Sequence, residues 1–283
     1  MYEWQAQARR FHISEASREA EYHVIEEMQK EVWGFNDLDA IPMAHLVAAQ
    51  HAGGMVLCAY EGTRMIGFAY GFPAHEGGRS SIHSHMLAVM PDCRNLQVGF
   101  HLKLAQRERA LESGLDEITW TFDPLQSLNA HLNVGKLGVI SDRYIVNFYG
   151  EATSSPLHQG FGTDRLWVRW LLESENVRQR LRGGARRGSH DVAATLRGPH
   201  LVLADGDQPR LGDLDGGVQA DRCFIGIPYN INLLKERDRE LGAAWRSITR
   251  RAFLAALDAG FMIQDFLVAR DQETVGGLYV LVK

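Results

Sequence analysis

Two stretches near the start of the sequence carry the apolar spacing of amphipathic helices. In residues 15–32 apolar positions recur every three to four residues among charged ones, and residues 43–51 form a shorter run that ends before Gly53 and Gly54. Such spacing places apolar side chains on one face of a helix, and paired glycines favour its end. We therefore expect two helices in this part of the chain.

A β-hairpin and a buried strand are predicted next. Residues 56–60 and 65–72 are rich in strand-forming residues and flank a short polar turn, which is typical of a hairpin. We expect a glycine-rich loop at residues 75–81, and the apolar run at residues 82–90 favours a strand buried on both faces. Strict alternation would place four of its side chains on one face, namely His83, His85, Leu87 and Val89.

The following segments complete a βαβ unit. Residues 98–113 have a helical apolar stripe that ends before Gly114, and residues 117–122 have the composition of a strand. A strand, a helix and a strand in this order favour a parallel pair of strands. A short helix and two strands are expected downstream, at residues 131–138, 142–150 and 164–173.

The C-terminal part contains a faint repeat of this unit. The hexapeptide ALESGL at residues 110–115 resembles ALDAGF at residues 256–261, and a strand is expected directly after each. A further strand is expected at residues 223–228, so the order suggests a degenerate second copy of the βαβ core. Chance similarity between amphipathic helices is the alternative interpretation.

Composition narrows the class of protein. The chain has 283 residues, of which 45% are hydrophobic, so it can form one large domain or two small ones. Its formal net charge of −5 argues against a nucleic-acid partner. The three cysteines, Cys58, Cys93 and Cys223, form no CxxC pair, and no apolar run approaches the length of a membrane helix or a signal peptide. We expect a cytoplasmic protein with no membrane partner.

The turn before the helix at residues 98–113 is a candidate anion site. The backbone amides of Gln97, Val98, Gly99 and Phe100 lie at a helix start, where amides lack intrahelical acceptors, and Arg94 adds a positive charge. Glycine at such a turn lets a ligand approach the backbone closely. The alternative is that Gly99 serves only the packing of the helix.

The stretch HMLAVMPDCRNLQVGFHL resembles the acetyl-CoA signature of the GNAT acetyltransferases. In that family a strand is followed by a turn of the form Arg/Gln-x-x-Gly-x-Gly/Ala, whose amides hold the CoA pyrophosphate. Arg94 and Gly99 match the first and last positions, whereas Gln97 stands where the family usually has glycine. The resemblance implies that the turn binds acetyl-CoA or another acyl-CoA through Arg94, Asn95, Leu96, Gln97, Val98, Gly99 and Phe100.

The resemblance covers about residues 15–173. The run Lys136-Leu137-Gly138 matches a later segment of the family, in which an asparagine contacts CoA. Asn129 is the first candidate for that contact and Asn133 the second. The resemblance implies a GNAT-like mixed α/β sheet flanked by helices over residues 1–173. We expect an arginine- and glycine-rich linker at residues 174–197, with a phosphate or nucleic-acid patch as the alternative, and a smaller α/β half-domain at residues 198–283.

The family's chemistry suggests roles for further residues. Its central strand separates from a neighbour, and the freed amides, here those of Leu87, Ala88 and Val89, would meet the pantetheine arm and the thioester. His83 and His85 could take the proton of the attacking amine, because imidazole titrates near neutrality, and Glu76 and His75 are further candidates. The tyrosine that protonates the thiolate in many members is Val134 here, so Tyr144 and Tyr149 are candidate replacements.

These observations predict an acyltransferase that moves an acetyl or similar group from acyl-CoA directly to an amine, most simply of a small molecule. No activated nucleophile and no third metal ligand accompany the two histidines, so neither an acyl-enzyme nor a metal is expected. The alternatives are an inactive CoA-binding protein and an interaction scaffold. A homodimer is left open.

Overall fold

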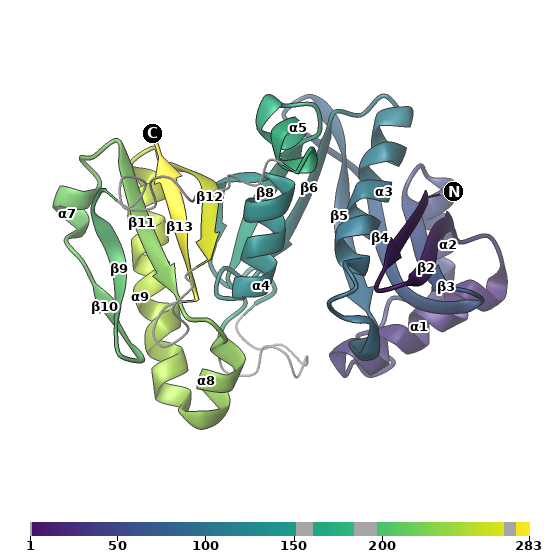
Figure 1. The fold of residues 1–283 in the computed structure, drawn as a ribbon, viewed down its shortest axis with the longest axis horizontal. Coiled ribbons are helices and arrows are strands. Elements are labelled where there is room, and N and C mark those ends of the chain that lie inside the picture. The colour runs from purple at the N-terminus through teal and green to yellow at the C-terminus, as the bar shows by residue number, and fades with distance from the viewer. Residues whose placement is uncertain (1, 151–160, 184–196, 269–275) are drawn as a thin grey trace. The chain divides into compact units, whose positions relative to one another are not determined.

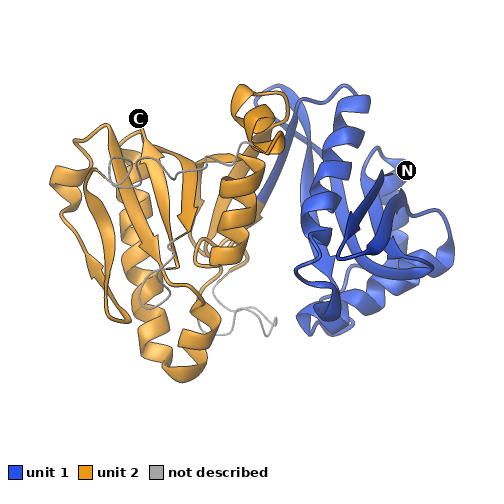
Figure 2. Ribbon diagram, in the orientation of Figure 1, with its two compact units in different colours: residues 1–120, 152–159 blue, residues 121–151, 160–283 orange. Residues whose placement is uncertain are grey.

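The computed structural model describes residues 2–150, 161–183, 197–268 and 276–283. The chain divides into two compact units (Figure 2). Unit 1 comprises residues 1–120 and 152–159, and unit 2 comprises residues 121–151 and 160–283. Each unit is described by itself.

Unit 1 is built on a mixed sheet (Figure 1). Five strands follow one another in antiparallel order, and the sixth, β6, pairs in parallel with the fifth and continues into unit 2. The strands are β1 (Tyr2–Ala6), β2 (Arg9–Glu15), β3 (Met55–Glu61), β4 (Arg64–Glu76), β5 (Arg79–Val89) and β6 (Glu117–Phe122).

Helices cover both faces of this sheet. On one face lie α1 (Glu19–Trp33) and α2 (Met43–His51), whose Trp33 and His45 rings contact Phe68 and Tyr70 of β4. On the other face lies α3 (Val98–Glu112), which packs on Gly67 of β4 and donates a hydrogen bond from Lys103 to the Ser84 side chain of β5. The predicted mixed α/β class with flanking helices is confirmed, and so is the parallel pair around α3.

The N-terminal hairpin was not predicted. Its turn at Gln7 and Ala8 has positive φ angles of 49° and 62° without a glycine or asparagine, so the residues that normally mark such a turn are missing. Trp4 of β1 stacks on His101 of α3, and its Nε1 donates a hydrogen bond to the Leu96 carbonyl oxygen at 3.3 Å. The hairpin therefore holds the start of α3.

Two expectations for β4 and β5 were wrong. The predicted loop at residues 75–81 is a tight turn at Gly77 and Gly78 between two longer strands. The alternation along β5 is interrupted, because Gly71 pairs with Ser84 while the adjacent Tyr70 pairs with Met86. One extra residue in a strand shifts every later side chain to the other face. Leu87 therefore points towards Gly99 of α3, away from the face of His83.

In unit 2 the strands follow one another in the order β8-β7-β12-β13-β11-β9-β10. The strands are β7 (Ile140–Ile145), β8 (Arg165–Leu171), β9 (His200–Asp205), β10 (Gln208–Leu211), β11 (Arg222–Ile227), β12 (Met262–Val268) and β13 (Gly277–Val282). β7 ends at Ile145, five residues before the predicted end of this strand. Asn147 has a left-handed backbone with φ 50°, and the chain turns there.

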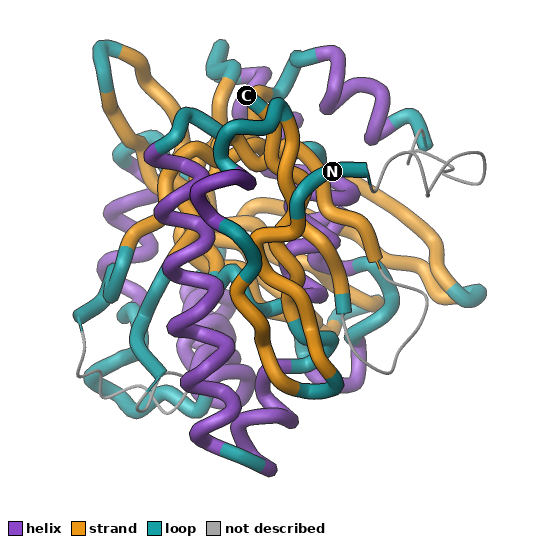
Figure 3. Tube along the Cα trace, turned by 90° about the vertical axis from the view of Figure 1, so that its left-hand side faces the viewer, coloured by secondary structure: helices purple, strands orange, loops and turns teal. Residues whose placement is uncertain are grey.

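The helices of unit 2 are mostly short, and α9 is the long exception (Figure 3). Its buried side chains contact the sheet, with Trp245 and Phe253 fully enclosed. The helices are α4 (Ser127–Ala130), a π-helix (His131–Leu137), α5 (Glu175–Leu181), α7 (Leu214–Gly217), α8 (Ile231–Arg237) and α9 (Arg239–Asp258); in unit 1 a 3₁₀ turn spans Pro91–Cys93.

The suggested second copy stays a prediction. In unit 2, β11, α9 and β12 follow one another as a strand, a helix and a strand. However, β13 lies between β11 and β12 and is antiparallel to both, so the two strands do not pair directly as β5 and β6 do.

The predicted division of the chain at residue 173 also stays a prediction, since the two compact units are bounded differently. Of the predicted linker, residues 184–196 lie outside the described residues, while α5 precedes them. Arg180 of α5 forms an ion pair with Asp265 at 2.8 Å. Within the described residues no helix is long and apolar enough to cross a membrane, and Cys58, Cys93 and Cys223 are buried and free.

Candidate functional site

β5 separates from β6 partway along its length. The two strands pair at Ile82↔Ile118 and His83↔Thr119, whereas β5 remains paired with β4 as far as Val89. In the described part of unit 1, no strand is paired with the other side of residues 84–89. Within unit 1 the backbone of this segment is therefore open on that side.

The direction of the open amides follows from the pairing with β4. Met90 N donates a hydrogen bond to Ile66 O at 2.9 Å, and alternate residues of an antiparallel strand direct their amides to the same neighbour. The Ala88 amide therefore faces β4, and those of Leu87 and Val89 face the open side. Of the three predicted amide donors, two are placed to meet a ligand.

The start of α3 supplies a second group of amides. The first helical bond runs from His101 N to Gln97 O at 3.0 Å, and the N-cap has neither a side-chain hydrogen bond nor an acidic residue in the turn that follows. Among the described residues no acceptor is assigned to the amides of Val98, Gly99 and Phe100. A helix start in this condition attracts anions.

The turn before α3 has a strained backbone. Asn95 and Gln97 have φ angles of 70° and 62°. Asparagine tolerates the left-handed region, whereas glutamine does so only at a cost. Glycine at this position would adopt the same backbone without that cost. The Gln97 side chain is exposed.

Gly99 has an ordinary helical backbone, so its role is steric. A Cβ at this position would lie 3.3 Å from Leu87 Cδ2 and 3.9 Å from Val89 Cγ2 of β5. The missing side chain therefore lets α3 begin directly against the open end of β5. The packing interpretation of Gly99 is supported, and it is compatible with an anion at the neighbouring amides.

The charges around the turn favour an anion. Arg94 is exposed. Asp92, the acidic residue of the turn, is held by Arg64 in contacts of 2.7 and 3.1 Å, and the hydrogen bond from Arg64 lowers the pKa of that carboxyl. The carboxylate is neutralised by its partner, which leaves the Arg94 guanidinium as a charge for a ligand.

A cluster of histidine and aromatic rings lies on the opposite face of β5. His83 and His85 lie 5.3 and 5.6 Å from the Phe72 ring, and the His85 ring lies edge-on to Tyr70 at 6.1 Å. His45 Nε2 and the Tyr70 hydroxyl are 2.9 Å apart. We call these five residues the histidine cluster. His85 stays on the face of His83, as alternation predicts, and the extra residue moves only the later side chains of Leu87 and Val89 to the other face.

The two predicted bases differ in their surroundings. His83 is buried, with Nδ1 3.0 Å from Thr119 Oγ1, and burial followed by the charge of His85 lowers its pKa to about 4. His85 is half-buried, and burial followed by the charge of His45 lowers its pKa. Both rings are neutral near pH 7 and can accept a proton. No hydrogen-bond partner is assigned to the His85 ring among the described residues, so its nitrogens are free for a substrate.

The other predicted residues are distributed over both units. His75 and Glu76 are exposed at the tip of the β4–β5 hairpin. Tyr144, Tyr149, Asn129 and Asn133 belong to unit 2, and their roles towards CoA stay predictions.

Within unit 2, both predicted tyrosines contact charged side chains of the same unit. The Tyr144 hydroxyl donates to Asp164 Oδ2 at 2.6 Å, and burial followed by the charge of Asp164 raises its pKa. The Tyr149 ring is 5.2 Å from the Arg165 guanidinium. Val134, at the family's tyrosine position, is fully buried. Tyr144 is therefore a poor proton donor, since its proton is already shared with a carboxylate.

The predicted asparagines differ in exposure. Asn129 is exposed at the end of α4, whereas Asn133 is buried in the π-helix, and its carbonyl oxygen accepts a hydrogen bond from Val139 N at 3.2 Å. Gly138 ends this helix with φ 74°, as the lysine-leucine-glycine run suggested. The exposed amide of Asn129 is the more available to a ligand.

Sequence reasoning missed His45 and Tyr70. His45 is a polar residue within the apolar first half of α2, and that position is the signal in the sequence. Tyr70 looks like an ordinary strand residue, because its neighbours in β4 are apolar. Among the described residues no group of three histidine, cysteine or acidic side chains is placed to hold a metal.

The comparisons with known proteins bear on residues 13–132, which match the model of the acetyltransferase (GNAT) family. The resemblance seen in the sequence is thereby confirmed over that range. A comparison with curated proteins finds no match.

Solved structures of similar fold include three acetyltransferase-related proteins. A ribosomal-protein-alanine N-acetyltransferase from Escherichia coli is 13% identical with a TM-score of 0.47, covering 58% of this chain and 95% of that one. A GNAT-family acetyltransferase from Streptococcus pneumoniae is 15% identical with a TM-score of 0.44, covering 56% and 97%. An Arabidopsis thaliana protein solved with a CoA bisubstrate analogue is 15% identical with a TM-score of 0.42, covering 56% and 97%.

Proposed function

We propose that this chain, with its GNAT acetyltransferase match at residues 13–132, transfers an acetyl or similar acyl group from acyl-CoA to the amine of a small molecule. The observation that carries the proposal is the continuous open edge formed by residues 84–89 of β5 and the first amides of α3. An elongated ligand with an anionic end fits such an edge.

The assignment of ligand groups follows the chemistry of that edge. The amides at the start of α3, together with Arg94, take the pyrophosphate, because oriented N–H groups and a guanidinium both favour an anion. The amides of Leu87 and Val89 take the pantetheine arm and the thioester oxygen. Donors at the thioester oxygen stabilise the charge that develops as the amine attacks.

His85 is the base that we assign to the amine. Only the neutral amine attacks, so a group must accept its proton, directly or through water. His85 is neutral near pH 7, and its ring nitrogens have no assigned partner among the described residues. His83 is bound to Thr119, so we assign it to positioning His85 through the ring contact at 6.3 Å.

The transfer forms one bond and breaks another. The amine nitrogen attacks the thioester carbon, the carbon–sulfur bond breaks, and CoA leaves as a thiolate or, after protonation, as a thiol. In unit 2 the Tyr144 hydroxyl is held by Asp164, and Val134 offers no proton. We therefore expect the thiolate to leave with little help from a protein acid.

Calorimetric titration with acetyl-CoA, free CoA and adenosine diphosphate tests the first half of the proposal. Micromolar binding of all three would support the pyrophosphate site, and an acceptor screen that follows free thiol would then test turnover. Binding without product from any amine would favour the inactive CoA-binding protein. Absence of binding to all three ligands would contradict the proposal and favour an interaction scaffold.

A further inference from the structure

Unit 2 contains a cavity of about 360 Å³ beside α9. Four residues of α9, at relative positions i, i+3, i+4 and i+7, form one wall, and Phe161 and Gly162 form part of another. The α9 residues are Ala243, Arg246, Ser247 and Arg250. This spacing places all four on one face of the helix.

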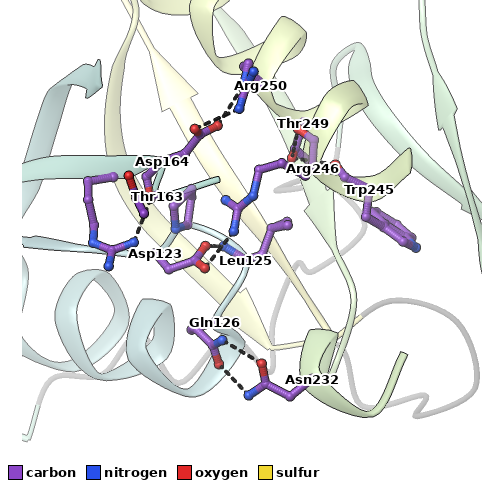
Figure 4. A network of polar contacts seen from close by, with 12 residues as sticks. Asp123, Leu125, Gln126, Thr163, Asp164, Asn232, Trp245, Arg246, Thr249 and Arg250 are labelled. Carbon is purple, nitrogen blue, oxygen red and sulfur yellow. Dashed lines mark hydrogen bonds and ion pairs between the residues drawn. The ribbon is translucent and has the colours of Figure 1, made fainter. Parts of the chain in front are cut away.

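Arg246 is the buried charge of this wall. It is 4% exposed, and its Nη2 donates to Asp123 Oδ2 at 2.6 Å (Figure 4). Its Nε and Nη1 are buried, and neither has a hydrogen-bond partner in the described parts of the chain. Unsatisfied buried donors of a charged group are costly and rare, so the two nitrogens indicate an acceptor that is still to be supplied.

Arg250 supplies a second guanidinium one turn further along α9. Its Nε and Nη2 contact the two carboxylate oxygens of Asp164 at 2.7 and 2.9 Å. Asp164 is fully buried and also accepts the Tyr144 hydroxyl. At Gly162, φ is 69°, and a Cβ there would lie 3.3 Å from Arg250 Nη2, so the glycine keeps this part of the cavity open.

The charges assigned around the cavity are unequal. The carboxylates in these contacts are Asp123 and Asp164, and both are already bound. The cations comprise the two wall arginines, Arg165 on the Asp164 carbonyl oxygen, and Lys235 and Arg239 at 4.5 and 5.6 Å from the Phe161 ring. The described residues that line the cavity include Arg246 and Arg250 and no carboxylate, so its wall presents positive charge to an anion.

We infer that this cavity of unit 2 binds a small molecule through its oxyanion group, a carboxylate or a phosphate, with Arg246 and Arg250 as the recognising residues. Guanidinium groups suit the planar or tetrahedral oxygens of both groups. The exposed Ser247 hydroxyl adds a donor, and Phe161 and Ala243 offer an apolar wall for the body of the ligand. The volume is at the small end of ligand sites, which limits the ligand to a small molecule.

The test is calorimetric titration of the full chain with three probes: inorganic phosphate, phenyl phosphate and benzoate. Binding of phenyl phosphate and phosphate alone would identify a phosphate site, and binding of benzoate alone a carboxylate site. Arg250→Gln should lower the affinity for whichever probe binds by about tenfold or more. The matched control is Arg251→Gln, an exposed neighbour on α9 that does not line the cavity, and it should leave the affinity unchanged.

Two further variants keep the test decisive. Ala243→Leu fills the cavity from an exposed helix position without removing a charge, so it should abolish binding of phenyl phosphate or benzoate in a folded protein. Gly99→Glu alters the start of α3 in unit 1 and should leave probe binding intact. Absence of binding for all three probes would overturn the inference. So would equal affinities in the Arg250→Gln and Arg251→Gln proteins, or loss of phosphate binding in Gly99→Glu.

Discussion

Lys103 of α3 lies with its Nζ 3.6 Å from the centre of the Trp120 ring of β6 and donates a hydrogen bond to Ser84 Oγ of β5 at 2.7 Å. Ser84 in turn donates to Gln106 Oε1 at 2.8 Å. Lys103 is 4% exposed, and burial lowers its pKa well below the usual value. The contacts of Lys103 with Ser84 and Trp120 thus connect α3 to β5 and β6 next to His83 and Thr119, where the pairing of the two strands ends.

Replacing Lys103 by methionine should flatten the pH dependence of stability. An unfolded lysine titrates near pH 10.4. Below that pH, and down to the lower pKa of Lys103 in the folded protein, the amine is protonated in the unfolded chain and neutral in the folded one. The free energy of unfolding of the native protein therefore rises with pH over this window, by about 1.4 kcal/mol per unit. Lys103→Met should remove that contribution in urea unfolding between neutral pH and pH 10. The exposed Lys136→Met is the control, and parallel curves for native and Lys103→Met would refute a neutral buried lysine.

Gln97→Gly should stabilise the protein. The left-handed backbone at Gln97 costs a residue with a side chain about 1–2 kcal/mol, and part of that gain is offset by the greater freedom of glycine in the unfolded chain. We expect a net rise of up to about 1 kcal/mol in the free energy of unfolding. Asn95→Gly should give a smaller rise, because asparagine already tolerates this conformation. A less stable Gln97→Gly protein would show that the side chain makes a contact worth more than the strain.

Gly99→Glu should abolish CoA binding in a folded protein. The added carboxylate would lie at the amides that we assign to the pyrophosphate, where it repels a second anion and occupies its donors. Gly99→Ala tests the effect of packing without an added charge. The alanine Cβ fits if the Leu87 side chain moves by a few tenths of an ångström. Alanine should therefore reduce stability slightly and retain most of the affinity. Titration of both variants with CoA, alongside their melting temperatures, measures the two effects; a folded Gly99→Glu protein with native affinity rules out the turn as the pyrophosphate site.

His85→Gln should lower kcat by about 10²- to 10⁴-fold, the usual contribution of a general base, with little change in CoA affinity. His83→Gln should have a smaller effect, because that ring is bound to Thr119. Burial lowers the pKa of His85, so the base loses its proton-accepting form only below the usual histidine pKa. The acid limb of kcat/KM that belongs to His85 should accordingly lie below about pH 6.5 and vanish in His85→Gln. An unchanged profile in that variant would remove His85 from the mechanism.

Asp164→Asn should destabilise unit 2. The change weakens the paired contacts to Arg250 and removes the charge that accepts the Tyr144 hydroxyl. Breaking a buried pair from one side costs about 3–5 kcal/mol. Asp207→Asn is the matched control, since the Asp207 pair with Arg237 is exposed and should cost under about 1 kcal/mol. Equal midpoints in urea unfolding would show that Asp164 is dispensable to the fold.

The sequence predicts best those elements that are flanked by turn-forming residues. The helix at residues 43–51 and the strand at residues 117–122 have the bounds that were expected. The turn at Gln7 and Ala8 contains no residue that favours a positive φ, so the sequence does not predict the N-terminal hairpin. The extra residue in β5 is equally silent, because histidines at positions 83 and 85 continue the alternation in the sequence while the register shifts in the structure.

The site residues proposed from the sequence form a local motif, whereas the residues that only the structure brings together depend on packing. The turn from Arg94 to Gly99 can be recognised because its residues are contiguous. His45 joins His85 only through Tyr70, across three separate elements, and no spacing in the chain encodes that contact. In the sequence, the arginines of α9 have the pattern of an ordinary polar helix face. Their partners Asp123 and Asp164 are distant in the sequence, and only the fold places them beside the arginines.

The position of β13 has a consequence for how the protein is made. Residues 277–282 follow β11 and β12 in the sequence but lie between them in the sheet. During synthesis both neighbours therefore emerge from the ribosome before the strand that joins them, and each exposes an unpaired edge until it arrives. Such edges pair readily with foreign strands. Until β13 has emerged, these two unpaired edges are therefore sites at which the nascent chain is prone to aggregate.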